Sequence, residues 1–183
     1  MGLEDDLRRV ADAAIRHAEP EEELTGIVPA EPSEGERAYL CAYRSGEGAT
    51  TWLVLDSDAH AVDERSRVRE IVSIAALCEL AEELAGGGDL DELRSQLVAL
   101  RLTENPPGID EAEDAAVDLQ AAVGASPRVA TPERLDAVGA ATRRLEQALG
   151  EGSSPFAVAM KQAVATVEEL TRDVELNYKR ELV

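Results

Sequence analysis

Aromatic side chains are scarce in this chain. Among its 183 residues there are one Phe, three Tyr and one Trp, together 3% of the sequence, whereas we count 30 alanines. Small side chains allow helices to pack closely, but each one buries little apolar area. A core of this composition needs many Leu, Val and Ala contacts along long helices. It therefore favours a mainly helical protein over one built around a few large rings.

Basic residues are also few, and only Lys161 and Lys179 are lysines. The chain carries 18 basic against 38 acidic residues, which gives a formal net charge of −20 at pH 7. Such a surface repels phosphate backbones, and no basic stripe offsets it, so we expect no nucleic-acid partner. An excess of one charge most often marks a solvated surface, although it also attracts a basic partner or a cation.

Long apolar runs and cysteine motifs are missing as well. No stretch approaches roughly 18 uncharged apolar residues, so we expect no membrane span. The first residues, MGLEDDLRRVADAAIRHA, contain no apolar signal segment. Cys41 and Cys78 stand far apart in apolar runs and form no CxxC motif. This favours reduced, buried thiols, with a single disulfide as the alternative, and we expect a cytoplasmic protein.

Hydrophobic periodicity places a small sheet near the start of the chain. The strands RAYLCAYR and ATTWLVLD flank a turn, SGEG, and contain three of the five aromatic residues. Further on, IVSIAALCELA is apolar nearly all round, as in a buried central helix. The expected elements are a helix over 3–18, a proline-rich and acidic loop over 19–36 with a short edge strand at 24–28, strands at 37–44 and 49–56, a short third strand at 60–62, and the central helix over 64–85.

The rest of the chain is expected to be helical, because apolar residues recur there at helical spacing. The rigid stretch TENPPGI separates the first two of these helices. The expected start signals are Asp89, a capping box made by Asp110 and Glu113, Thr131-Pro132 and Ser154-Pro155, and the last helix is expected to run to about residue 180.

Apolar stripes on the last two helices raise the question of self-association. They are either the core of a monomeric bundle or, together with the Leu-rich helix at 90–102, partly the contact surface of a second protomer. A homodimer through the C-terminal helices is therefore one expectation. The stripe residues are Leu135, Val138, Leu145 and Leu149 on one helix, and Val164, Val167, Leu170 and Val174 on the other.

We predict an α+β fold that is predominantly helical, with a small antiparallel β-meander packed on the central helix and a C-terminal helical bundle. Residues 1–36 form an N-terminal helix and the proline- and acid-rich loop. Residues 37–88 form the meander and the central helix, and residues 89–183 form the C-terminal helical region. We expect the last two segments to be one continuous domain, since even ~150 residues suffice for a single core.

The densest cluster of chemically capable side chains is the stretch DSDAHAVDE. Asp56, Asp58 and Asp63 could bind a hard cation such as Mg²⁺ or Ca²⁺, and His60 could add a nitrogen ligand. The spacing does not match an EF-hand loop, however, and the second histidine, His17, lies on a different element. Asp side chains also favour turns, because they accept hydrogen bonds from backbone N–H groups two residues on. A turn followed by a helix cap is the preferred interpretation, and a metal or catalytic site is the alternative.

Other catalytic motifs are missing. The chain contains no GxSxG nucleophile motif, no glycine loop followed by Lys and Ser or Thr, and no Glu-x-x-His pair of the helical di-iron kind. Glu79, Glu82 and Glu83 follow the apolar part of the central helix and are interpreted as its solvated end, with a buried Glu79 as the alternative. No cofactor is expected.

We therefore favour a non-enzymatic function. The sequence predicts an acidic interaction or adaptor module that binds a protein partner or itself, with Tyr39, Tyr43 and Trp52 of the sheet as contact residues. The alternative is a small-ligand- or divalent-metal-dependent enzyme, with the Asp/His cluster described above at the junction of sheet and central helix.

Overall fold

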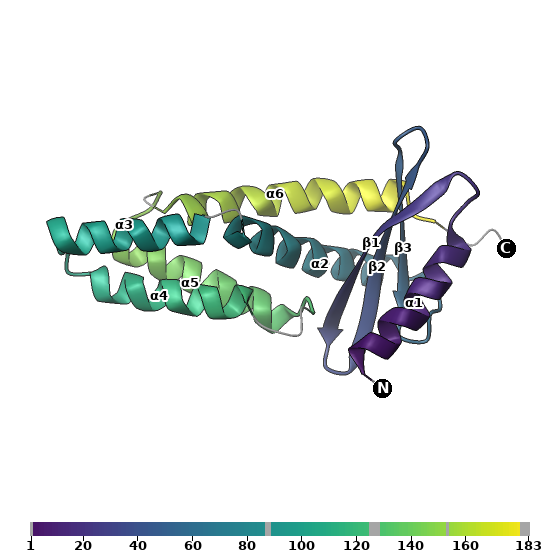
Figure 1. Ribbon diagram of the computed structural model, residues 1–183, viewed down its shortest axis with the longest axis horizontal. Coiled ribbons are helices and arrows are strands. Elements are labelled where there is room, and N and C mark those ends of the chain that lie inside the picture. The colour runs from purple at the N-terminus through teal and green to yellow at the C-terminus, as the bar shows by residue number, and fades with distance from the viewer. Residues whose placement is uncertain (1, 87–88, 125–128, 153, 180–183) are drawn as a thin grey trace. The chain divides into compact units, whose positions relative to one another are not determined.

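The computed structural model describes residues 2–86, 89–124, 129–152 and 154–179 (Figure 1). The described residues form six helices and one three-stranded antiparallel sheet, and 62% of them are helical. This confirms the predicted α+β fold in which helices dominate. In chain order the elements are α1 (Leu3–His17), β1 (Glu22–Ser33), β2 (Glu36–Ser45), β3 (Thr50–Asp56), α2 (Arg65–Gly86), α3 (Asp89–Thr103), α4 (Ile109–Val123), α5 (Pro132–Leu149) and α6 (Pro155–Leu176).

The chain divides into two compact units, which we call the sheet unit and the helical unit. The division does not follow the predicted segment boundaries at residues 36 and 88. Helices α2 and α6 each contribute residues to both units. The sheet unit comprises Met1–Ala75, Val129–Thr131 and Val167–Val183, and the helical unit comprises Ala76–Arg128 and Pro132–Thr166.

The sheet is a meander in the order β1-β2-β3, with antiparallel neighbours. Side chains alternate between the two faces of a strand. The face that carries Tyr39, Cys41 and Tyr43 packs against α1 (Figure 1). These three residues, with Val10 and Ala14 of α1, are 0% exposed. Two of the five aromatic side chains, Tyr39 and Tyr43, are thus part of this core, and Tyr178 packs against it.

The opposite face of the sheet carries Leu40 and Val54, which are also buried. The first turns of α2 belong to the same unit, and they bury Ile71 and Val72. Helix α2 therefore begins on the side of the sheet that faces away from α1 (Figure 1). This arrangement agrees with the prediction of a meander packed on a central helix.

The edge strand predicted at 24–28 is confirmed but is longer than predicted, because it is the middle of β1, a strand of 12 residues at one edge of the sheet. The loop predicted over 19–36 is therefore wrong for most of its length. The third strand predicted at 60–62 is also wrong, since Ala61 forms only a single bridge with Leu55. The length of β1 was underestimated because Pro29 lies within it, and proline rarely occurs inside a strand. Here its carbonyl accepts the amide of Ala130 at 2.9 Å. A strand residue directs its nitrogen and carbonyl to the same side, so Pro29 removes no hydrogen bond from the ladder with β2.

The helical unit is built around one core shared by α3, α4 and α5. The predicted stripe of α3, represented by Leu90, Leu93 and Leu97, is buried there, so the chain itself covers this helix. Of the predicted stripes on α5 and α6, Val138, Leu145, Val167 and Val174 are buried, Leu135, Leu149 and Leu170 are half-buried, and Val164 is exposed. Self-association through the C-terminal helices stays a prediction.

The helix ends match some of the sequence signals. Ser154 is buried, and its Oγ accepts a backbone amide of the first turn of α6 at 3.3 Å, as predicted. The capping box predicted for α4 is wrong. The residue before this helix is Gly108, and no side chain of the described residues caps it. The side chains of Asp110 and Glu113 instead bind Arg101 of α3.

The last helix is shorter than predicted. Helix α6 ends at Leu176 instead of about residue 180, and Tyr178 forms a bridge with Trp52 of β3. The chain leaves the helix because backbone groups of β3 offer alternative hydrogen bonds. Across the described segments, no helix combines the length and the apolar character needed to cross a membrane.

Candidate functional site

The predicted Asp/His cluster forms a tight turn at the end of β3. The Oδ1 atom of Asp56 accepts the backbone amides of Asp58 at 2.9 Å and of His60 at 2.8 Å. The turn also places Ala59 in the left-handed region, with φ of 65°. The carboxylate of Asp56 thus stabilises the backbone of the turn, which is the interpretation that the sequence favoured.

The four residues of this cluster do not gather around a common point. The His60 side chain is 79% exposed, and its Nδ1 lies 3.8 Å from Oδ2 of Asp56. Asp58 and Asp63 are exposed, and α2 begins at Arg65, so Glu64 and not Asp63 is the residue directly before the helix. In the part of the chain that the structure describes, no group of three or more His, Cys, Asp or Glu residues could hold a metal ion. The metal alternative receives no support from this geometry.

A cavity of about 260 Å³ lies at the junction of the sheet and α2, where the enzyme alternative expects its site. Asp56 lines this cavity, but the other three residues of the predicted cluster do not. The lining arginines are Arg37, paired with Asp6 at 3.1 Å, and Arg67, paired with Glu70 at 3.0 Å. Both cations already have carboxylate partners, so neither is free to bind an anionic substrate.

Two further groups with catalytic potential have shifted pKa values. Both cysteines are buried, as predicted, and burial raises the pKa of Cys41 to about 12. This thiol is therefore protonated at neutral pH and is a poor nucleophile. Glu79 is exposed, as in the preferred interpretation. Partial desolvation of its carboxyl group, and then the charges of Glu83 and Glu82, raise the pKa of Glu79.

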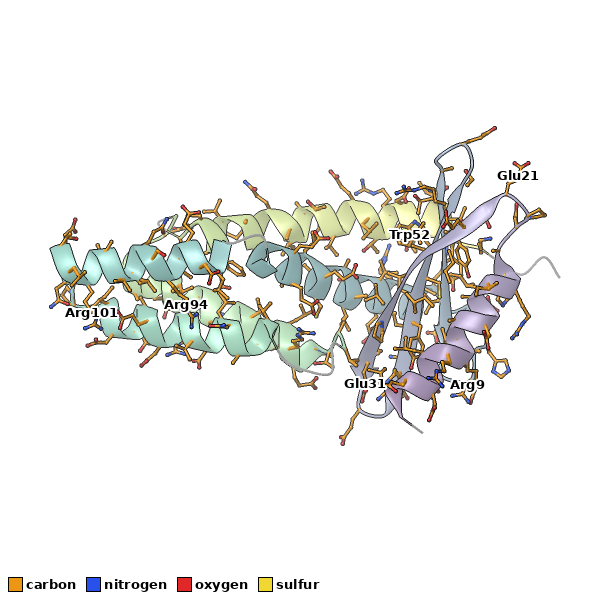
Figure 2. All side chains as sticks on the ribbon, in the orientation of Figure 1. Arg9, Glu21, Glu31, Trp52, Arg94 and Arg101 are labelled. Carbon is orange, nitrogen blue, oxygen red and sulfur yellow. The ribbon has the colours of Figure 1, made fainter. Side chains whose placement is uncertain are left out.

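The predicted contact residues of the sheet are mainly core residues. Tyr39 and Tyr43 are 0% exposed, and the Tyr43 hydroxyl donates to the carbonyl of Ala14 in α1 at 3.0 Å. Trp52 is half-buried, and its Nε1 donates to Asp173 of α6 at 3.1 Å (Figure 2). A partner could reach the two tyrosines only by displacing α1. Their role as contact residues stays a prediction, and the geometry does not favour it.

Exposed aliphatic side chains occur on α1 and α6, and also on the helical pair α3 and α4. Val98 and Leu102 of α3 are 56% and 80% exposed, and Val117 of α4 is 57% exposed. Val98 and Leu102 are four positions apart, so they share one face of α3. We call the surface formed by these three residues, together with Arg94 and Arg101 of α3, the hairpin face.

The contacts of Arg101 place the three aliphatic residues on the same side of the helical pair. Arg101 follows Val98 by three positions, so both lie on one face of α3. Its Nε donates to Oε1 of Glu113 in α4 at 2.7 Å, and this hydrogen bond lowers the pKa of Glu113. Glu113 in turn precedes Val117 by one helical turn. Figure 2 labels Arg94 and Arg101 on α3, next to α4.

Acidic residues surround the hairpin face. Residues 89–123 contain nine Asp and Glu residues and two arginines, a net charge of −7. Arg144 of α5 adds one positive charge, because it pairs with Glu111 and Asp118 of α4. A large negative excess remains. The arrangement is a small apolar patch bordered by carboxylates, with Asp114 one turn before Val117.

Sequence reasoning missed the hairpin face because it searched for residues that continue the core stripe. Val98 and Leu102 fall outside the stripe that includes Leu93 and Leu97, on positions where an exposed helix normally carries polar residues. A helical projection of α3 contains this signal, since two aliphatic residues stand one turn apart on its polar side.

Arg134 of α5 is a second residue that sequence reasoning missed. It is 8% exposed, its Nε donates to the carbonyl of Ala122 at 2.9 Å, and its guanidinium also donates to the carbonyl of Val123. The same group pairs with Glu82 at 2.8 Å. Arg134 thus satisfies the last carbonyls of α4 and neutralises one acid of the Glu79–Glu83 run, which is a structural role.

Comparison with protein-family models, with curated proteins and with solved structures finds no match to this chain. The fold and the geometry of the hairpin face are therefore the basis for a functional assignment.

Proposed function

We propose that this protein is a non-enzymatic interaction module whose hairpin face binds a basic, amphipathic segment of a protein partner. The observation that carries the proposal is the exposure of Val98, Leu102 and Val117 within a helical pair of net charge −7. Solvent-exposed aliphatic side chains can anchor an apolar partner surface, and the surrounding carboxylates select for Lys and Arg in that partner. A helix laid along the hairpin face is the simplest such partner.

The magnitudes indicate a binding mode that depends on charge. Burying a Val or Leu side chain fully is worth roughly 1.5–3 kcal/mol. The three side chains are 56%, 80% and 57% exposed in the free chain, so they supply about 3–6 kcal/mol together. The loss of translational and rotational freedom costs about 4–15 kcal/mol. Apolar burial alone therefore does not give tight binding. Electrostatic attraction between the surrounding carboxylates and a basic partner has to supply the rest of the binding free energy. Because salt screens this attraction, the affinity should fall as salt is added.

A second copy of the chain is a poor occupant of the hairpin face, because two surfaces of the same negative charge repel each other. The predicted homodimer would use the C-terminal helices instead, and light scattering at high protein concentration tests it. A mass of one protomer would remove that prediction. We further infer a cytoplasmic location, since Cys41 and Cys78 are both buried and are not joined in a disulfide.

The experiment uses a synthetic amphipathic helical peptide of Leu and Lys as the probe, and a matched peptide of Leu and Glu as its control. We expect the protein to bind the Leu/Lys peptide and not the Leu/Glu peptide in isothermal titration calorimetry. Replacing Val98 and Leu102 by Ser removes two anchors, and we expect the affinity to fall about 30- to 1,000-fold.

The matched control variant is Ile15→Ser, because Ile15 is also an exposed aliphatic residue, at 61%, but lies on α1 in the sheet unit. We expect this variant to bind the Leu/Lys peptide with the affinity of the unmodified chain. Equal losses in both variants, or no loss in the double variant, would contradict the proposed site. The enzyme alternative has its own test, in which a rise in melting temperature with millimolar Mg²⁺, Mn²⁺, Ca²⁺ or Zn²⁺ would revive it.

A further inference from the structure

The residues that follow α6 pair with the outer edge of β3. The amide of Trp52 donates to the carbonyl of Asn177 at 3.1 Å, and the amide of Lys179 donates to the carbonyl of Trp52 at 2.7 Å. Tyr178 between them forms a parallel bridge with Trp52. We call Asn177, Tyr178 and Lys179 the C-terminal clasp. It occupies the edge of β3 in the way an added strand would.

Tyr178 contributes a second set of contacts through its hydroxyl group. The hydroxyl accepts the amide of Val54 at 3.0 Å and donates to the carbonyl of Val62 at 2.7 Å. The ring packs against the core of the sheet unit, and burial raises the pKa of Tyr178 to about 12. One tyrosine hydroxyl thus satisfies two backbone groups beside β3, a role that phenylalanine could not fulfil.

Lys179 contributes a third set of contacts through its ammonium group. The Nζ atom donates to the carbonyl of His17 at the end of α1, at 3.0 Å, and pairs with the carboxylate of Glu22 in β1. It also lies 4.5 Å from the ring centroid of Tyr43. The Glu22 side chain is only 7% exposed, and Thr51 of β3 donates to it at 2.8 Å. Carboxylate, carbonyl and ring together form a receptor for one cation.

We propose that the edge of β3 is a binding surface for an extended segment of another protein that carries tyrosine followed by lysine, and that the C-terminal clasp occludes this surface in the resting chain. The backbone hydrogen bonds to Trp52 can form with any extended segment, whatever its side chains. The hydroxyl contacts at Val54 and Val62, and the cation receptor at Glu22, select for the two side chains. The clasp stands directly after α6, so it can leave the edge of β3 without unwinding the helix.

The proposal is independent of the hairpin face, which lies in the helical unit. Because the clasp belongs to the same chain, its effective concentration at the edge is in the millimolar range, and a separate segment has to compete with it. We therefore expect weak binding to the unmodified chain and much tighter binding once the clasp is loosened.

The experiment uses the full chain with Lys179→Glu, which places a negative charge against Glu22. The probe is an acetylated and amidated peptide of residues 173–179, DVELNYK, and Trp52 is the only tryptophan, so its fluorescence reports the edge. We expect the peptide to bind Lys179→Glu at least tenfold more tightly than the unmodified chain. A peptide with Phe in place of Tyr should lose most of this affinity.

The matched control is Lys161→Glu, which makes the same charge change at the other lysine, on the exposed part of α6. It should bind the peptide like the unmodified chain. Hydrogen exchange of the Trp52 and Val54 amides shows whether the edge is open in each variant. If Lys179→Glu loses its fold, or keeps both amides protected, Tyr178→Phe replaces it.

Three results would overturn the proposal. In the first, the amides of Trp52 and Val54 exchange freely but the peptide does not bind, so the edge is only a covered strand edge. In the second, both clasp variants keep the amides protected and bind no peptide. In the third, clasp variants form dimers by exchanging C-terminal segments, so the occupant of the edge is a second copy of the chain.

Discussion

Arg134 satisfies the carboxyl-terminal end of α4 from a neighbouring helix. Its guanidinium donates to the carbonyls of Ala122 and Val123, and each charge-assisted hydrogen bond of this kind is worth about 1.5–3 kcal/mol. We expect Arg134→Met to lower the free energy of unfolding by roughly 2–4 kcal/mol in urea denaturation, because buried carbonyls lose their donors. The control is Arg143→Met at an exposed position of α5, with an expected loss below about 0.5 kcal/mol. Equal losses would mean that Arg134 has no special role.

Glu79 is a residue at which negative charge destabilises the folded chain. Its pKa is raised by desolvation and by Glu83 and Glu82, so the folded state binds a proton more readily than the unfolded state. Stability therefore increases as the pH falls through the raised pKa, and the ionised form is unfavourable at pH 7. The residue is exposed and solvent screens the effect, so we expect Glu79→Gln to raise the melting temperature at pH 7 by only about 1–2 °C.

The same substitution should have no effect near pH 4, where Glu79 is protonated and already neutral. Glu168→Gln, at an exposed position of α6, is the matched control for the loss of one surface charge. If both variants raise the melting temperature equally at pH 7, general charge repulsion and not the local cluster is the cause.

At the scale of elements, the approach of α4 to the end of α5 requires a glycine. A Cβ atom on Gly108 would lie 2.5 Å from the carbonyl oxygen of Ala148 and 3.2 Å from its Cα. These are backbone atoms, so one helix has to move. We expect Gly108→Ala to lower the free energy of unfolding by about 1–3 kcal/mol, measured in urea. Gly46→Ala is the control, because its Cβ would meet nothing within 4 Å. Unchanged stability of Gly108→Ala would show that α4 and α5 can separate freely.

The elements that the sequence predicted well are those whose signals are local. The apolar run of α2, the alternation in β2 and β3, and Ser154 before α6 each act through neighbouring residues. The errors occur where a distant segment supplies the partner. Pro29 is tolerated in β1 because its nitrogen faces away from β2, on the side where Ala130 pairs with its carbonyl, and Asp110 and Glu113 bind Arg101 instead of capping α4. Helix α6 ends early for the same reason, since β3 binds the C-terminal clasp. None of these partners is visible in a short window of sequence.

The C-terminal clasp should loosen in acid. Burial alone would raise the pKa of Glu22, but hydrogen bonds from Lys179, the amide of Glu19 and Thr51 outweigh it, and the pKa lies below its ordinary value of 4.5. A carboxylate with a depressed pKa stabilises the folded state above its unfolded pKa, and this contribution is lost as the pH falls through the folded pKa. We expect the fluorescence of Trp52 to change below about pH 4.5, because the clasp then leaves β3.

Lys179→Met tests this pH dependence. The variant has no ammonium group to bind Glu22, so its fluorescence should differ from that of the unmodified chain at neutral pH and should respond less to acid. An identical acid response in both proteins would contradict the role of the Glu22–Lys179 pair.

At the scale of the whole molecule, composition predicted the dominance of helix but not the place of the candidate site. The tyrosines of β2 were attractive contact residues because they are large and apolar, and the same property buries them against α1. Val98 and Leu102 show the reverse, because they were not predicted as contact residues and are exposed. They are aliphatic like core residues, but they stand on the polar side of α3 and are exposed there. Exposure depends on which faces the other elements cover, so residue type alone does not predict it.

The net charge of −20 should make the stability of the whole chain depend on salt. Self-repulsion opposes the compact state, and raising the ionic strength shortens the screening length from about 10 Å at 0.1 M to about 3 Å at 1 M. Salt also weakens surface ion pairs such as those of Arg101 and Arg144, but exposed pairs contribute only about 0–1 kcal/mol each. Repulsion summed over the whole surface is the larger effect. We therefore expect the melting temperature to rise by about 3–6 °C between low salt and roughly 0.5 M NaCl, equivalent to about 1.5 kcal/mol.

Calorimetry at constant pH measures this rise, and choline chloride in place of NaCl separates screening from binding of Na⁺. The two salts should raise the melting temperature equally, because both shorten the screening length by the same amount. A rise with NaCl alone would instead point to a bound cation, and would reopen the carboxylate-rich turn at Asp56 as its site. A fall with both salts would show that local ion pairs, and not self-repulsion, dominate the electrostatics of the folded chain.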